Sequence, residues 1–406
     1  MQKRVLIVSA DAELRRELGG EEGRKAVGLD FEFADTAVEA LTRLGRQNYT
    51  AVLAEWHLDG ATRGNLLLDE VMRRQPSALR FIRATLDDQV AAMRCIGTAH
   101  RFLIEPTDVQ TLRYAIEQAL WMETWLPFER VRSLLTRLRN IPSPPQIYFE
   151  VVSQLQSPEV SLDDIGETIA RDPAITAKLL QLVNSAVFGL QLQVGHPAEA
   201  IGYLGLEATK SLVILAHTFS HFADLVTPGF SIEGLWNHSH STARCARWIA
   251  EFESRDSGLA AHTFTAGLLH DFGKIVLAAN HSKEFQRALQ RATDEQIETW
   301  QAELDQFGTH HGEVGACLLA IWGLPMPIIQ AVGLHHRPVR FSEAEFTPLA
   351  AVHVANVFAQ TVELHRPQPA LPQLDMAYLQ EFVSGDRIAD WTRIISEMAN
   401  TTPAAV

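Results

Sequence analysis

The residues of this chain with the clearest capacity for chemistry are His270 and Asp271, which are adjacent in the sequence. A neutral imidazole and a carboxylate can bind the same divalent ion, or two neighbouring ions. An apolar run at residues 266–269 precedes them, so we expect one rigid helix to present both side chains. An adjacent His and Asp on a helix are more often only solvated or hydrogen-bonded. The dipeptide alone therefore does not establish a metal site.

Further histidines lie in other segments of the second half of the chain. They are His238, the pair His310-His311 and the pair His335-His336. Segments this far apart place their side chains on separate helices, and such helices can converge around one bundle interior, as in other helical metal sites. The sequence thus predicts a helical second half with its histidines around one interior.

The length and composition limit the kind of protein that this chain can be. Its 406 residues predict two or three domains, and 47% hydrophobic with 21% charged residues is typical of a globular protein. The formal net charge of −14 argues against nucleic acid or anionic lipid as the main partner. The three cysteines, Cys95, Cys245 and Cys317, form no CxxC pair, which suits a reducing compartment. No apolar run approaches the ~18 residues of a membrane helix, so we expect a cytoplasmic protein with no membrane partner.

Short apolar runs alternate with amphipathic stretches in the first ~120 residues, which predicts an α/β doubly wound parallel sheet. The expected strands are residues 5–8, 51–54, 81–82 and 102–104. The expected helices are residues 12–18, 37–44, 65–74 and 90–96. Functional residues of such a sheet lie just past the carboxyl ends of its strands.

The residues at these strand ends are Ser9-Ala10, Glu55, Thr85 and Glu105-Pro106. In their positions they resemble a receiver domain of bacterial two-component response regulators, over residues 3–122. Receivers carry an acidic pair after strand one, a phosphoacceptor Asp after strand three, a Ser or Thr after strand four and Lys-Pro after strand five. Only the Thr85 and Pro106 positions match that pattern, so the resemblance implies a degenerate receiver.

The substituted residues remove the chemistry of phosphorylation. Phosphoryl transfer to a carboxylate needs Mg²⁺ to neutralise the oxygens and a cation to hold the product. Ser9 and Ala10 take the place of the metal-binding carboxylates and leave only the neighbouring Asp11. Glu105 puts a negative charge where the Lys would be, and Glu55 is one methylene longer than the phosphoacceptor. We expect that this domain, at residues 1–122, is not phosphorylated.

A helical pattern continues past the sheet domain, over residues 112–138, with a break at Pro127. We expect a connecting helix at residues 123–140. Such a helix can form a homodimer or pack on its own domain, and the sequence leaves both open. The proline cluster at residues 141–145 marks a domain boundary, because it cannot continue a helix.

Two predicted helix starts follow this boundary. Ser161 stands three residues before Asp164, as in a capping box, and Asp172 before Pro173 is typical of a helix N-cap. Two capped helices joined by a tight turn also occur in DNA-binding helix-turn-helix motifs. The second helix here has Lys178 as its only basic residue. We therefore expect a core helix and no nucleic-acid partner.

Several motifs from residue 141 to 340 occur together and in a fixed order. They are Ile141-Pro142-Ser143-Pro144-Pro145, Arg171-Asp172-Pro173, Leu182-Val183-Asn184-Ser185, Ala200-Ile201 with Leu204-Gly205, residues 267–274, His311-Gly312-Glu313-Val314-Gly315, Trp322-Gly323-Leu324-Pro325 and His335-His336. The segment resembles an HDOD domain, a regulatory offshoot of the HD phosphohydrolase superfamily related to HD-GYP proteins. The resemblance implies an all-α HD-type helical bundle. Residues 341–406 would be a C-terminal helical extension, with a closing helix near 349–358 and a packing or dimer helix near 388–398.

The resemblance also implies a set of metal ligands in one interior cavity, with His310 pointing elsewhere. They are His238, His270, Asp271, His311, His335 and His336. Donors so rich in imidazole suit Fe, Mn, Zn or Ni better than Mg or Ca, which prefer oxygen. Two departures from the superfamily pattern weigh against turnover. Its last Asp is Asn356 here, and Arg337-Pro338-Val339-Arg340 stands where HD-GYP proteins carry Gly-Tyr-Pro.

These features favour a non-catalytic signal-transduction protein, in which a degenerate receiver is coupled to an HDOD module that binds other signalling proteins. The alternative is a metal-dependent phosphodiesterase that acts on cyclic dinucleotides or nucleotides. HD-GYP relatives hydrolyse cyclic di-GMP, and in an active enzyme Lys274 would contact the phosphate. The eroded receiver site supports the first function, and the retained His270-Asp271 pair supports the second.

Overall fold

The fold is taken from a computed structural model that describes residues 3–19, 29–58, 62–85, 88, 99–105, 109–122, 124–135, 145–155, 160–184, 194–222, 225–338, 346–363, 374–381, 383 and 385–401. It divides into two compact units, Met1–Arg137 with Leu318–Leu324, and Leu138–Cys317 with Pro325–Val406. Some predictions fall outside the described residues: the helix at 90–96, Pro106, Cys95, the stretch 136–144, Ser185, and Val339 with Arg340.

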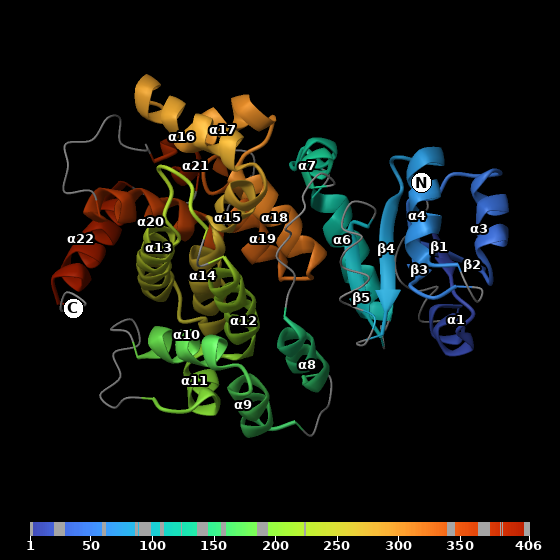
Figure 1. The fold of residues 1–406 in the computed structure, drawn as a ribbon. Helices are drawn as coiled ribbons and strands as arrows, with labels where there is room; N and C mark the ends of the chain where they lie inside the picture. Colours follow the sequence, from blue (N-terminus) through green and yellow to red (C-terminus); the bar gives the residue numbers. More distant parts are fainter. Residues whose placement is uncertain are drawn as a thin grey trace. The chain divides into compact units, whose positions relative to one another are not determined.

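The first unit is built on a five-stranded parallel sheet with the strand order β2-β1-β3-β4-β5 (Figure 1). The strands are β1 (Lys3–Val8), β2 (Leu29–Ala34), β3 (Ala51–Glu55), β4 (Leu79–Ala84) and β5 (Arg101–Ile104). Every residue of β4 is buried, as is typical of an inner strand of a parallel sheet that helices cover on both faces. This is the order of flavodoxin-like doubly wound folds, and the predicted α/β sheet is confirmed.

Strand β2 was not predicted from the sequence. Its apolar residues alternate with Asp30 and Glu32, and its four middle positions are only half-buried. The strand pairs with β1 alone and forms one edge of the sheet. An edge strand has one solvated side, so it needs no continuous apolar run.

Helices cover both faces of this sheet. They are α1 (Ala12–Gly19), α3 (Ala37–Leu44), α4 (Gly64–Arg74) and α6 (Val109–Met122), and α7 (Phe128–Leu135) follows. Side chains alternate across a strand, and one core joins Ile7 and Phe81 of the sheet to Leu14 of α1 and Ile116 of α6. On the other face, α4 packs on β3 and β4. The interruption between α6 and α7 falls at Pro127, as predicted.

The second unit contains only helices among its described elements, as the sequence predicts. They are α8 (Gln146–Gln154), α9 (Leu162–Ala170), α10 (Pro173–Val183), α11 (Pro197–Leu204), α12 (Leu206–His221), α13 (Ile232–Glu253), α14 (Ser257–Leu269), α15 (Phe272–Asn280), α16 (Ser282–Glu295), α17 (Thr299–Phe307), α18 (His311–Ile321), α19 (Met326–Leu334), α20 (Pro348–Glu363), α21 (Met376–Leu379) and α22 (Gly385–Thr401). Both predicted caps are confirmed. Ser161 and Asp164 form a capping box, and the Asp172 carboxylate accepts a hydrogen bond from the backbone of Ile175 at 3.0 Å.

Helices α13, α14, α19 and α20 pack against one another at the centre of this unit (Figure 1). Helix α20 closes the bundle, as predicted from residues 349–358. Helix α22 packs on α13 within its own unit, where Trp391 is fully buried and its indole N–H donates to Glu253 at 2.7 Å. Among the described residues, no helix combines the length and the apolar composition that a membrane crossing requires.

Two glycines set the close approach of helices around the candidate site. A Cβ atom at Gly267 would lie 2.6 Å from the Cα of Ala243 on α13. At Gly273 it would lie 2.0 Å from the backbone oxygen of His311, at the start of α18. Any larger residue would push α14 from α13, or α15 from α18. The two glycines thus bring α13 and α18 against the segment that carries His270 and Asp271.

Candidate functional site

His270 and Asp271 form the turn between α14 and α15. Helix α14 ends at Leu269, and Asp271 leaves the helical conformation with φ −99° and ψ 7°. The prediction that one rigid helix presents both side chains was therefore wrong. The turn still brings the two side chains together, with His270 Nε2 3.5 Å from Asp271 Oδ2.

The structure brings together all six residues expected as metal ligands, and it arranges them in two clusters that share Asp271. We call the first cluster A; it consists of Asp271, His311, His335 and His336. We call the second cluster B; it consists of His238, His270 and Asp271. Oxygen Oδ1 of Asp271 faces cluster A and oxygen Oδ2 faces cluster B. His310 belongs to neither cluster, and its Nδ1 accepts a hydrogen bond from the backbone of Gly312 at 3.2 Å.

The ligand atoms of cluster A have the separations of a four-coordinate site. The Nε2 atom of His311 lies 3.0 Å from Asp271 Oδ1 and 3.0 Å from Nε2 of His336. The Nε2 atom of His335 lies 3.9 Å from Asp271 Oδ1, and all four ligand atoms are within 4.8 Å of one another. Ligands about 3.4 Å apart surround a tetrahedral ion with bonds of ~2.1 Å.

Cluster B is equally compact and shares the Asp271 carboxylate, but its next neighbour is a neutral amide. The Nε2 atoms of His238 and His270 are 3.2 Å apart, and they lie 3.7 and 3.5 Å from Asp271 Oδ2. The amide oxygen of Asn356, on α20, is 3.0 Å from Nε2 of His238. The residue expected at the last Asp position of the superfamily pattern thus presents a neutral amide to cluster B.

Hydrogen bonds to Nδ1 fix the orientation of three imidazole rings. His270 donates from Nδ1 to the backbone oxygen of Gly267 at 2.7 Å, and His335 donates to that of Val332 at 2.8 Å. A ring that gives its Nδ1 proton to a carbonyl presents a lone pair at Nε2. His311 instead has its Nδ1 2.6 Å from Oε2 of Glu303. In all three rings, Nε2 is turned toward Asp271.

Burial gives these residues the charge states that suit metal ligands. Burial lowers the pKa of His270 to about 3, and it holds the pKa values of His335 and His336 well below their usual range. These imidazoles are therefore neutral at pH 7. Burial raises the pKa of Asp271, but His270, Lys274 and His311 outweigh it and hold that pKa well below its usual value. His270, His335 and His336 thus offer lone pairs around one ionised carboxylate. At His311, burial lowers the pKa, but the carboxylates of Glu303 and Asp271 outweigh it and raise that pKa.

Two buried atoms of the site lack a hydrogen-bond partner within the described structure. They are Oδ1 of Asp271 and Nε2 of His335, which face each other in cluster A. Buried polar atoms are nearly always hydrogen-bonded, and an unpaired one indicates a missing partner. A divalent cation between the two atoms would satisfy both, so the residues present fit a metal.

Two charged neighbours of the clusters come from α15 and α17. The Nζ atom of Lys274 lies 2.7 Å from Asp271 Oδ2. The sequence singled out Lys274, but only as a phosphate contact in an active enzyme. Glu303 was missed, because nothing in the sequence of α17 distinguishes it from Asp305, the other acidic residue of that helix.

The receiver-like unit has a second cluster of polar side chains at the carboxyl ends of its strands. The Arg83 guanidinium lies at its centre, with Nη1 3.0 Å from Glu55 Oε1, 3.1 Å from Asp11 Oδ2 and 3.8 Å from Glu105 Oε1. Ser9 donates a hydrogen bond to the same oxygen of Glu55. Arg83 is 5% exposed and supplies one positive charge to the three acidic residues from within the fold.

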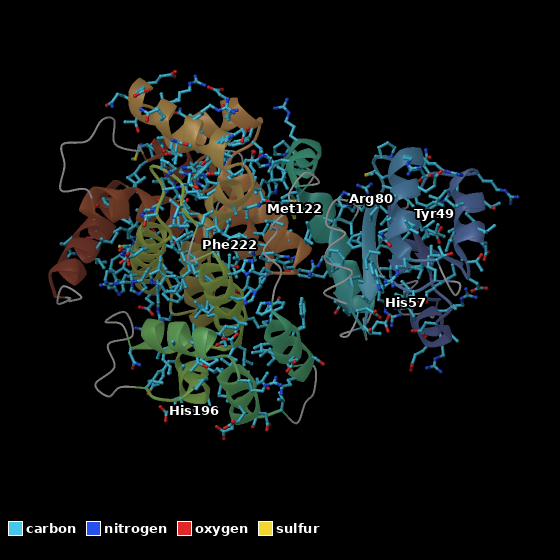
Figure 2. The ribbon with its side chains drawn as sticks, in the orientation of Figure 1. Tyr49, His57, Arg80, Met122, His196 and Phe222 are labelled. Atoms are coloured by element: carbon cyan, nitrogen blue, oxygen red, sulfur yellow. The ribbon has the colours of Figure 1, made fainter. Side chains whose placement is uncertain are left out.

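Arg83 was not predicted, although a signal for it was present. Strand β4 holds two arginines in an otherwise apolar run, and a buried charge in a central strand requires a partner. Arg80 lies near the amino end of β4 and donates to the backbone oxygen of Ala78 at 2.7 Å. His57 lies at the opposite edge of the sheet, just past the carboxyl end of β3 (Figure 2). Thr85 donates to Asp88 at 3.0 Å. Of the two arginines of β4, Arg83 is the one that lies next to the strand-end acids.

We expect acetyl phosphate with Mg²⁺ to leave the full chain unphosphorylated. The Arg83 side chain already holds the carboxylates that Mg²⁺ would have to bind, and Glu105 repels the product. Intact-protein mass spectrometry would check this, with a receiver that keeps its acidic pair as a positive control. Glu55→Asp should stay unmodified too, because Arg83 remains. A base-labile phosphoryl group on the wild-type chain would contradict the prediction.

Comparison with known proteins gives a family for the helical unit and a solved structure with a similar fold. The family model described as the HDOD domain matches residues 141–338. An uncharacterized protein of Treponema pallidum is 28% identical over 251 residues, which is 61% of this chain and 48% of that protein. The chain thus spans about half the length of this relative. An HDOD domain protein of unknown function from Geobacter sulfurreducens is 24% identical, with a TM-score of 0.53 over 67% of this chain and 95% of that one.

A putative phosphohydrolase from Shewanella amazonensis is 17% identical, with a TM-score of 0.49 over 68% of this chain and 98% of that one. The Geobacter structure supports the fold of the helical unit. The family match covers all six residues of the two clusters, whereas Asn356 lies beyond it. The strand order of the first unit is that of flavodoxin-like folds. Residues 141–338 are therefore an HDOD domain, which follows a receiver-like parallel sheet in the chain.

Proposed function

We propose that this protein transmits signals by binding other signalling proteins, and that its HDOD domain holds a divalent metal without turning over a substrate. The observation that carries this proposal is the burial of four of the six cluster residues. His270, Asp271, His311 and His335 are each at most 1% exposed. Structural metal sites are closed, whereas catalytic sites keep one position open to water or substrate. A site this closed favours a structural or regulatory ion.

The chemistry of cluster B also argues against hydrolysis. A two-metal hydrolase holds its ions with shared carboxylates and a bridging hydroxide. Cluster B has one oxygen of Asp271 as its only charged ligand atom, and the ammonium group of Lys274 lies against that oxygen. Asn356 adds a neutral amide. A second ion would therefore meet a weak site.

In this proposal the receiver-like unit acts without phosphorylation. Its acidic residues are already paired with Arg83, so a phosphoryl group is not the signal that it receives. We propose that it contacts a partner protein or a second copy of the chain. The net charge of −14 makes nucleic acid an unfavourable partner.

One observation favours a second function, that of a metal-dependent phosphodiesterase on cyclic dinucleotides or nucleotides. The two oxygens of Asp271 face two separate clusters, as a carboxylate that bridges two ions would. When bound, a metal pair would supply a nucleophilic hydroxide and Lewis acidity. Lys274 lies on the same side as cluster B, where its ammonium group would balance the charge of a phosphate.

Metal analysis combined with a cyclic di-GMP hydrolysis assay separates the two functions. We expect the purified protein to bind Fe, Mn, Zn or Ni, and to hydrolyse cyclic di-GMP at the background rate with each of them. Metal-dependent turnover by the wild type that is lost in His270→Ala/Asp271→Ala would establish the phosphodiesterase. A wild type that binds none of these metals would refute both functions as stated.

A further inference from the structure

Glu303 is a charged side chain in a fully buried position of α17. Its exposed fraction is 0%, and Oε2 accepts a hydrogen bond from the backbone N–H of His311 at 2.7 Å. The same oxygen lies 2.6 Å from Nδ1 of His311, while Oε1 has no hydrogen-bond partner among the described residues. An ionised carboxylate is costly to bury, so its charge requires an explanation.

Helix capping explains only part of this arrangement. The bond to the backbone of His311 satisfies an N–H group at the start of α18, but a neutral acceptor would do the same. The partner of Nδ1 in His311 differs from the partners of Nδ1 in the other two oriented rings. His270 and His335 are oriented by neutral carbonyl groups, whereas His311 is oriented by a carboxylate. A carboxylate on the far nitrogen makes an imidazole a stronger metal ligand and fixes its Nε2.

The charges around the two clusters are therefore unequal. Cluster A has Asp271 as a ligand and the Glu303 carboxylate directly behind His311. In cluster B, the positive charge of Lys274 lies 2.7 Å from the oxygen that Asp271 contributes, and Asn356 is neutral. A cation is attracted to the first and opposed in the second.

We propose that Glu303 is a positioning residue that makes cluster A the tight metal site, and that Lys274 keeps cluster B weak. The inference rests on the proposed metal binding and adds an order to it: the first ion binds at cluster A through Asp271, His311, His335 and His336. The HDOD domain would then hold one ion under conditions in which a two-metal hydrolase holds two.

The test is titration of the full-length, metal-free protein with Co²⁺ and Zn²⁺, followed by calorimetry and by the visible spectrum of Co²⁺. Glu303→Gln keeps the shape and the acceptor oxygen but removes the charge. We expect its first binding event to weaken by about 10- to 100-fold, with a shift of the Co²⁺ spectrum and little change in the metal-free melting temperature. Glu313→Gln is the matched control, because Glu313 is buried on α18 and binds Thr309 at 2.8 Å outside both clusters.

A second variant tests the weak cluster separately. Lys274→Met should tighten the second binding event more than the first, because the ammonium group lies against the oxygen that Asp271 turns to cluster B, so that two equivalents of Co²⁺ bind at lower concentration. The inference is wrong if Glu303→Gln binds the first ion as tightly as Glu313→Gln does, or if Glu303→Gln only lowers the metal-free melting temperature. It is also wrong if Lys274→Met leaves the second event unchanged. A wild-type protein that binds no Co²⁺ or Zn²⁺ would instead refute the proposed metal binding itself.

Discussion

Replacement of both His270 and Asp271 by alanine should abolish the thermal stabilisation that the wild-type protein gains from a transition metal. An ion held by these clusters links the α14–α15 turn to α13, α18 and the end of α19. The unfolded chain cannot assemble ligands so far apart, and the binding free energy therefore adds to the free energy of unfolding. With metal at 100 times its dissociation constant, the gain is about 2.7 kcal/mol.

The quantity to compare is the rise in melting temperature between chelator and metal, since the double variant will also change the metal-free value. His310→Ala is the matched control, because His310 is buried beside cluster A and contributes no ligand to either cluster. The His310→Ala variant should show the same metal-induced rise in melting temperature as the wild type. A double variant that gains as much from metal as the wild type would show that the ion binds elsewhere.

The second large effect is expected at Arg83. Arg83→Met should destabilise the receiver-like unit by roughly 3 kcal/mol, because it leaves Asp11, Glu55 and Glu105 without their shared counter-ion. Hydrogen exchange of the full chain, followed in peptides from β3 and β4, measures the change in this unit alone. The double variant Arg83→Met/Glu55→Gln should recover part of the loss, since it removes one of the unpaired charges.

The loss at Arg83 should also depend on pH. Burial already raises the pKa of Glu55 above its ordinary value, and removal of the guanidinium raises it further. A carboxyl group with a raised pKa in the folded state binds a proton more tightly there than in the unfolded chain, so folding is favoured as the pH falls. The deficit of Arg83→Met should therefore shrink from pH 7 toward pH 5. Equal exchange rates in the wild type and in Arg83→Met at pH 7 would contradict the role assigned to this residue.

The sequence by itself determined the elements and most of the chemistry-bearing residues. Buried parallel strands are continuous apolar runs, so β1, β3, β4 and β5 could be located without the fold. The caps at Ser161 and Asp172 are contacts between residues three positions apart, so the local sequence was enough to predict them. The six histidine and aspartate residues of the two clusters could be named because their motifs resemble those of a known family.

The tertiary structure alone decided how those residues meet. Strand β2 escaped prediction because an edge strand tolerates alternating charges. The turn at Asp271, which divides its oxygens between two clusters, depends on Gly273 approaching α18 at a distance that only glycine permits. Arg83 and Glu303 acquire their roles from partners distant in the chain or on another helix. Local sequence patterns indicate which residues are buried and where helices begin. The pairing of buried charges is set by packing between elements, so no local pattern predicts it.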